Sequence, residues 1–176
     1  PLRYLSRPAL RITDTRYIGT PAFSVEREQR FGLEAAAVHG RLHLASEVHW
    51  LKAQRDGFSD PIFFGAYAEV GVFLTKDSRP LKRGVFGTIK PRSPVGGGGI
   101  GALQFNLRYD FLDLNSSAVI GGVQNAYLAS LIWTPAENFR LMGQYSSLNY
   151  SDADIPASGR RAYGVNKFAV RGQISF

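Results

Sequence analysis

The sequence is organised as a series of segments, each about ten residues long, in which apolar and polar residues alternate. In the segment 167–176 the even positions are apolar or glycine, whereas the odd positions are polar or alanine. A period of two is the period of a β-strand, because successive side chains point to opposite faces. The alternation recurs in six further segments, less cleanly in the third and fifth of them: 30–37, 41–50, 62–73, 102–109, 124–133 and 139–145. The sequence therefore predicts an all-β chain with seven strands.

The length of these segments and the loops between them favour one class of β-protein. Strands of soluble proteins peak near 5–6 residues, whereas strands that cross a bilayer need roughly 9–11. Short turns at 39–40 and 134–138 contrast with longer polar loops at 53–61, 111–121 and 151–162. Short turns at one end and long loops at the other are typical of outer-membrane barrels. We therefore predict an antiparallel transmembrane β-barrel.

Seven strands do not close a bacterial barrel of the usual, even-numbered kind. An open edge in lipid would leave backbone groups unpaired at several kcal/mol each. Either an eighth strand lies within residues 1–29, or the chain is part of a larger barrel, and the second alternative is favoured. Residues 1–176 are then the C-terminal part of a single barrel domain, with residues 1–29 as an outer loop and a strand end.

Residues 74–99 form a long, basic and glycine-rich connection on the short-turn side. It carries six Lys or Arg residues against a single acid, Asp77. Three alternatives stay open: an enlarged turn, a segment with extra strand, or a loop that folds into the pore. Its charge could attract anions electrostatically, or it could be a solvated connection.

The chain has a formal net charge of +7, which fits either a nucleic-acid binder or a basic surface that faces anions. The alternation places nine charged residues on the polar face, which lines the lumen of a barrel, and favours the second reading. Arginine suits phosphate and carboxylate groups, and basic rings make pores anion-selective. Alternatively, these charges pair across the wall and only maintain its shape. The pore-lining candidates are Arg30, Arg41, Arg108, Arg140, Lys167, Arg171, Glu34, Glu47 and Glu69.

No motif of an enzyme, a metal site or a cofactor site is present in the sequence. There is no Cys, and hence no thiolate ligand or disulfide. His43 and His49 lie six residues apart on one strand, too far to share a metal ion. The glycine run 96–99 precedes a strand pattern rather than the helix that a phosphate-binding loop needs. We expect no catalysis, no cofactor and no nucleic-acid partner.

Aromatic residues cluster near the predicted strand ends, where barrels carry girdles at the two membrane interfaces. The candidates are Trp50, Phe63, Phe64, Tyr109, Trp133, Phe139 and Tyr150. The chain ends on Phe176 after an alternating strand. This ending is similar to the C-terminal signature of outer-membrane barrels, which implies recognition by the barrel-assembly machinery.

Several motifs in a fixed order resemble one family. Residues 31–38 read Phe-Gly-Leu-Glu-Ala-Ala-Ala-Val, similar to a Gly-Leu-Glu-Ala-Ala strand, and residues 74–80 are similar to Leu-Thr-Gly-Glu-Ser-Arg-Pro. Residues 84–91 match Gly-x-Phe-Gly-x-x-Lys-Pro. These motifs, from about residue 8 onward, resemble the phosphate-selective porin O and P family. Lys76 and Asp77 depart from its Gly-Glu, and Leu81 from its frequent Tyr.

The resemblance implies a sixteen-stranded, homotrimeric channel in the bacterial outer membrane, surrounded by its lipid, that passes phosphate or other small anions. This chain would be its C-terminal portion. The family's constriction loop comes from earlier strands, so no phosphate-site residue transfers to these positions. One alternative is a small stand-alone outer-membrane barrel with a structural or adhesion role, which needs an eighth strand. Another is a soluble β-barrel carrier with its apolar residues inside.

Overall fold

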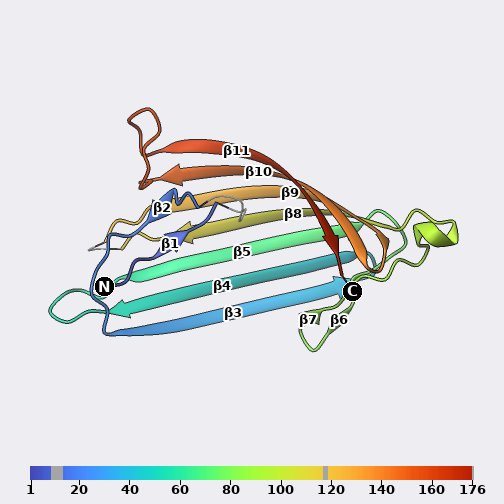
Figure 1. Ribbon diagram of the computed structural model, residues 1–176. Helices are drawn as coiled ribbons and strands as arrows, with labels where there is room; N and C mark the ends of the chain where they lie inside the picture. The colour runs from blue at the N-terminus through green and yellow to red at the C-terminus, as the bar shows by residue number, and fades with distance from the viewer. Residues whose placement is uncertain (9–13, 117–118, 176) are drawn as a thin grey trace.

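The computed structural model describes residues 1–8, 14–116 and 119–175, and its main element is one antiparallel sheet of seven strands. The strands run side by side in a strongly curved sheet, in which each strand pairs with the next along the chain (Figure 1). All seven predicted strands are present, and each is two to four residues longer than ten. They are β3 (Arg27–His39), β4 (Leu42–Gln54), β5 (Ile62–Phe73), β8 (Ala102–Asp113), β9 (Val123–Ala136), β10 (Phe139–Ser151) and β11 (Tyr163–Ile174).

The connections differ at the two ends of the sheet, as the sequence predicted. The long loops after β4, β8 and β10 lie at one end, and the short turns lie at the other, together with the long connection of residues 74–101 (Figure 1). The β3–β4 turn consists of Gly40 and Arg41, and Gly40 has a φ of 57°, a conformation that favours glycine. Arg41 was predicted as a strand residue on the polar face. That prediction is wrong, because β4 begins only at Leu42.

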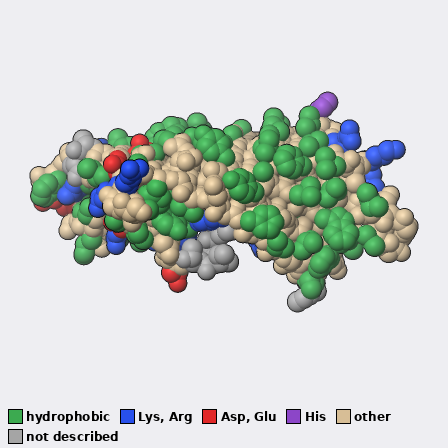
Figure 2. All heavy atoms as spheres, turned by 90° about the horizontal axis from the view of Figure 1, so that it is seen from above, with side chains coloured by type: hydrophobic (Ala, Val, Ile, Leu, Met, Phe, Trp, Pro, Cys, Tyr) green, Lys and Arg blue, Asp and Glu red, His purple; other side chains and the backbone are tan. Residues whose placement is uncertain are grey.

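The apolar residues of the strands lie on one face, which we call the outer face, and many of them are exposed. Register partners on neighbouring strands point to the same side, so Leu44, Val70 and Leu107 form a continuous row. A soluble protein rarely exposes such a large apolar surface. In Figure 2, hydrophobic side chains are spread over the visible face, with Lys and Arg mostly toward its two ends. The outer face is therefore suited to lipid.

The described parts of residues 1–26, which we call the N-terminal segment, pack on the opposite, inner face of the sheet at the long-loop end (Figure 1). Its short strands β1 (Leu5–Ser6) and β2 (Ile18–Gly19) pair with each other. Ile18 and Phe23 form a core with Phe63, Leu148 and other buried residues of the strands. Within the part of the chain that the structure describes, this segment adds no eighth strand to the large sheet.

Two of the predicted girdle aromatics belong to this core instead. Phe63 and Tyr150 are each 3% exposed and lie on the inner face, under the N-terminal segment. Their position near strand ends was right, but their side chains point away from the outer face. An inner-face core at this end explains the error, because it requires the aromatic side chains that a girdle also uses.

The connection between β5 and β8, residues 74–101, folds against the inner face from the short-turn end, and we call it the inserted loop. It contains a small hairpin of two strands with two residues each, β6 (Leu81–Lys82) and β7 (Val85–Phe86). It also contains a 3₁₀ turn, η1 (Val95–Gly97). The ring of Phe86 lies 6.0 Å from that of His43 on the inner face of β4. Two of the three alternatives are thus combined in this segment, because it contains extra strand and folds against the inner face.

Asp77 organises the inserted loop. Its carboxylate is 4% exposed, accepts a hydrogen bond of 2.6 Å from Thr75 Oγ1 and another of 2.7 Å from the Arg92 amide. Trp133 Nε1 of β9 donates to the Ile100 carbonyl at 2.7 Å. The two bonds to Asp77 hold the loop together internally, and the bond from Trp133 joins its C-terminal end to the sheet.

The outer edges of β3 and β11 have no neighbouring strand within the described residues. Each edge leaves a row of backbone donors and acceptors open, which lipid cannot satisfy. Among the same residues, no helix has the length and apolar character needed to cross a bilayer.

Candidate anion-binding face

A charged network lies on the inner face, beyond the core that the N-terminal segment forms with the strands, and the inserted loop contributes to it. Its centre is Arg108 of β8, which is the register partner of Glu69 on β5. Arg108 lies 2.7 Å from Asp110 Oδ1 and 3.9 Å from Glu69 Oε2. Its guanidinium also lies 3.7 Å from the centroid of the Tyr67 ring. Two carboxylates and one aromatic face therefore hold Arg108 in place.

The network extends from Arg108 toward β4 through Tyr67. The Tyr67 hydroxyl donates a hydrogen bond of 2.7 Å to Glu47, and the other oxygen of Glu47 lies 3.1 Å from His49 Nε2. Glu47 is thus occupied by neighbours on its own face. The second sequence alternative, in which charges pair across the wall, describes this part of the face well.

The inserted loop adds a cation that the alternation of the strands does not predict. Arg79 Nη1 lies 3.7 Å from Glu69 Oε1, and its guanidinium lies 4.1 Å from the centroid of the Phe86 ring. Burial lowers the pKa of Arg79, Glu69 opposes that shift, and the positive charge of Arg140 lowers the pKa further. Arg79 and Arg140 therefore lie close enough to repel each other, and an anion between them would relieve that repulsion.

These groups surround a hollow of about 420 Å³ on the inner face, which we call the polar recess. Arg79, Arg108 and Arg140 line it from the inserted loop, β8 and β10. Arg140 has no ion-pair partner among the residues that the structure describes. The remaining lining residues are Glu69, Ile89, Gln104, Asn106, Asp110, Leu128, Ser130, Ile132, Met142 and Gln144.

Of the nine predicted pore-lining residues, the polar recess brings together Arg108, Arg140 and Glu69. Arg30 lies on β3, where it is 2.6 Å from Glu28. Lys167 lies on β11 and donates to the Pro8 carbonyl at 3.1 Å. Those two belong to opposite edge strands, so the predicted set does not form one cluster.

The other members of the set are spread over the same face or lie beyond it. The register places Glu34 on the face of its partner Glu47, and Arg171 on the face of its partner Met142. Arg41 lies in the turn described above. Eight of the nine residues therefore share the inner face, as the alternation predicted.

Sequence reasoning missed two charged groups that matter here. Glu28 and Asp110 share the inner face and each pairs with an arginine, so the face is less basic than the nine candidates alone suggest. Asp110 could have been predicted, because it lies two residues from Arg108 and alternation places both on the same face. Arg79 was already among the six cations of residues 74–99 that could attract anions, but only the folding of the inserted loop brings it beside Glu69.

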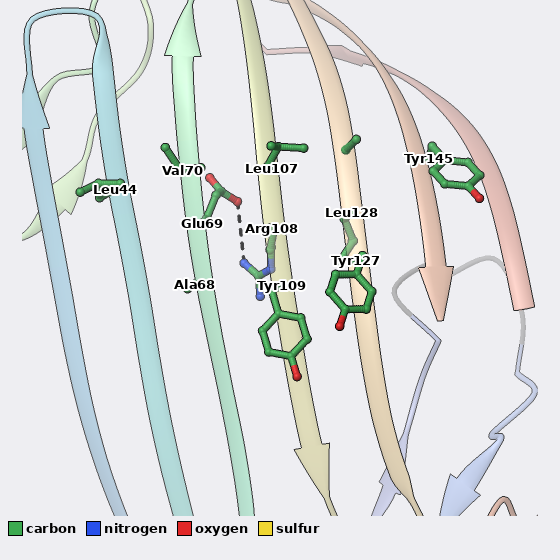
Figure 3. A pocket seen from close by; sticks show the side chains of 11 residues that line it. Leu44, Ala68, Glu69, Val70, Leu107, Arg108, Tyr109, Tyr127, Leu128 and Tyr145 are labelled. Atoms are coloured by element: carbon green, nitrogen blue, oxygen red, sulfur yellow. Dashed lines mark ion pairs between the residues drawn. The ribbon is translucent and has the colours of Figure 1, made fainter. Parts of the chain in front are cut away.

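The outer face carries a shallow apolar groove of about 540 Å³. Leu44, Val70, Leu107, Tyr127 and Tyr145 rise from β4, β5, β8, β9 and β10 around it (Figure 3). The Glu69–Arg108 ion pair is marked in the same view, and only a single layer of backbone separates the two faces. One thin wall thus presents hydrocarbon-like side chains on one side and charges on the other.

Aromatic rings form a row on the outer face toward the long-loop end. Phe31 and Trp50 lie 5.6 Å apart, Trp50 and Phe64 5.2 Å, and Phe64 and Phe111 5.9 Å, as ring centroids. The row crosses four neighbouring strands, from β3 to β8. Such a band matches the interfacial girdle of a membrane barrel.

The histidines do not assemble a metal site. His43 is buried on the inner face beside Gln104, at 3.3 Å, whereas His49 lies farther along β4 beside Glu47. Among the described residues there is no group of three or more His, Asp or Glu residues with metal-binding geometry.

Comparison with known proteins agrees with this two-faced wall. A model of the family described as phosphate-selective porin O and P matches residues 1–176. An uncharacterized protein of Caulobacter vibrioides is 46% identical over 174 residues, which is 99% of this chain but 35% of that protein. The chain thus spans about a third of the length of that relative. It belongs to the phosphate-selective porin O and P family, whose members are non-enzymatic porins, and its all-β antiparallel sheet is a portion of such a barrel.

Proposed function

We propose that the chain forms part of the wall of a bacterial outer-membrane channel that passes small anions by passive diffusion, with phosphate or polyphosphate as solutes of the family type. The observation that carries this proposal is the contrast between the apolar outer face and the polar recess, where Arg140 faces inward with no ion-pair partner among the described residues. Lipid contacts the outer face, and the solute path follows the inner face. The inner-face members of the nine predicted residues line that path.

The open edges of β3 and β11 support a larger barrel in which these strands are the C-terminal part. We further propose a homotrimer, in keeping with the family, and recognition of the terminal strand by the barrel-assembly machinery. Phe176, on which that recognition depends, lies outside the described residues. The stand-alone structural barrel has less support, because residues 1–26 contribute no strand to the sheet where they are described.

The test is the ion preference of the full-length protein to which these strands belong. The purified protein is inserted into planar bilayers, and the reversal potential is measured across a tenfold KCl gradient. A reversal potential of the sign that shows Cl⁻ to be more permeant than K⁺ supports the proposal. A reversal potential of the opposite sign contradicts it, whatever the conductance.

A further inference from the structure

A row of uncharged polar side chains crosses the floor of the polar recess. Ser130 of β9 is the register partner of Asn106 on β8 and of Gln144 on β10. Register partners lie about 4.5–5.5 Å apart and point to the same side of a sheet. The three side chains therefore form a continuous hydroxyl and amide row within the recess.

Guanidinium groups flank this row along the strands. Arg108 is two residues from Asn106, on the side of the long loops. Its charge is already matched by Asp110 at 2.7 Å and Glu69 at 3.9 Å. On the side of the short turns, Arg140 has no carboxylate partner within the described residues, so this is the position where an anionic group is best accommodated.

The row itself has hydrogen-bonding capacity to spare. Gln144 Nε2 donates to Ser146 Oγ at 3.0 Å, and its Oε1 has no partner among the residues that the structure describes. The Ser130 hydroxyl likewise has none within the same ranges. Asn106 is satisfied, because it donates to Glu69 at 3.1 Å and accepts from Gln104 at 2.6 Å. A ligand that matches the recess thus offers hydroxyl groups to Ser130 and Gln144.

We propose that the polar recess binds small hydroxylated organic anions, such as sugar acids, an inference that rests on the proposed channel function. The anionic group pairs with Arg140, and the hydroxyl-bearing chain lies along Ser130 and Gln144. A bare inorganic anion would pair with Arg140 but leave the hydrogen-bonding groups of the row without partners. The volume of about 420 Å³ also falls in the range of sites for organic molecules.

The experiment compares gluconate with hexanoate as blockers of the KCl current through single channels of the full-length protein. Both are six-carbon monocarboxylates, and only gluconate carries hydroxyl groups. We expect gluconate to half-block the current at a concentration about tenfold lower than hexanoate, since each hydrogen bond contributes a few-fold. Gln144→Met keeps the length of the side chain but removes the acceptor. It should raise the half-blocking concentration of gluconate about three- to tenfold and leave that of hexanoate unchanged.

Gln124→Met on β9 is the matched control, because Gln124 shares the inner face, as its register partner Tyr150 does, but does not line the recess. Ser130→Ala is a second test variant, and an unchanged KCl conductance shows that each variant is folded. Equal block by gluconate and hexanoate, or equal effects of the Gln144 and Gln124 substitutions, would overturn the inference. If either of these results is found in a channel that prefers Cl⁻ over K⁺, only the recess inference is contradicted. A channel that prefers K⁺ contradicts the proposed function itself.

Discussion

Arg108 Nη2 lies 2.7 Å from Oδ1 of Asp110, two residues farther along the same strand. The carboxylate offsets the charge of the arginine that lies nearest the centre of the inner face. Asp110→Asn should therefore make the electrostatic potential along the proposed path more positive, and the reversal potential should shift toward the value for a channel that passes only anions. Asp56→Asn in the exposed β4–β5 loop makes the same change of charge away from the recess and should shift it much less. Equal shifts for both variants would contradict a local effect.

Arg140 and Arg30 differ in whether a carboxylate accompanies them. Arg30 lies 2.6 Å from Glu28, whereas Arg140 has no such partner in the described part of the chain. Arg140→Gln should lower the anion-to-cation permeability ratio by roughly two- to fivefold, as expected for one charge about 5–10 Å from an ion in a water-filled path, where the dielectric constant is near 80. Arg30→Gln should lower it less. Permeability ratios from reversal potentials measure both effects, and a larger effect at Arg30 would refute this ranking.

The buried carboxylate of Asp77 holds the inserted loop through Thr75 and the Arg92 amide. Asp77→Ala should destabilise the loop by about 1–3 kcal/mol, because buried donors lose their acceptor. The measurable results are faster proteolysis within residues 74–101 and a noisier open-channel current. Lys90 lies in the same loop and forms an exposed ion pair with Glu137 of the β9–β10 turn. Lys90→Ala removes that ion pair and should change neither quantity much.

Ile18 is fully buried between the N-terminal segment and the inner face. Ile18→Ala should weaken the docking of that segment by about 2–5 kcal/mol, the usual cost of such a truncation. Limited proteolysis should then cut residues 1–26 faster than in the parent protein. Ile120→Ala is the matched control, because Ile120 is 65% exposed. Unchanged cleavage in the Ile18 variant would mean that the segment is held by other contacts.

Asp60 in the β4–β5 loop has a pKa below its usual value, first because the Arg55 amide donates to it and then because Lys52 lies 3.1 Å away. A depressed pKa stabilises the folded loop above the unfolded pKa of about 3.9, and this contribution is lost as pH falls through the lower folded value. Hydrogen exchange at the Arg55 amide should therefore lose protection below about pH 4. Asp60→Asn should remove this acid dependence, and an identical pH profile in the variant would contradict the assignment.

Local periodicity was sufficient to predict the seven strands and the side to which Glu69, Arg108 and Arg140 point. Each strand has one apolar and one polar face, and that alternation is written directly in the sequence. Phe63 and Tyr150 escaped it, because whether an aromatic residue faces lipid or an inner core depends on where residues 1–26 pack. Arg79 escaped it for the same kind of reason. Its place beside Glu69 depends on the path of a loop with almost no regular structure of its own.

The N-terminal segment and the inserted loop cover the inner face from opposite ends and leave the polar recess between them. In a closed barrel, these two covers narrow the aqueous path near its ends, so electrical resistance concentrates in the covered sections. Most of an applied voltage would then fall across the N-terminal segment and the inserted loop, and less across the recess between them. A charge substituted in only one of the two covers would rectify the current, whereas the same charge in the recess would leave the current–voltage curve more nearly symmetric.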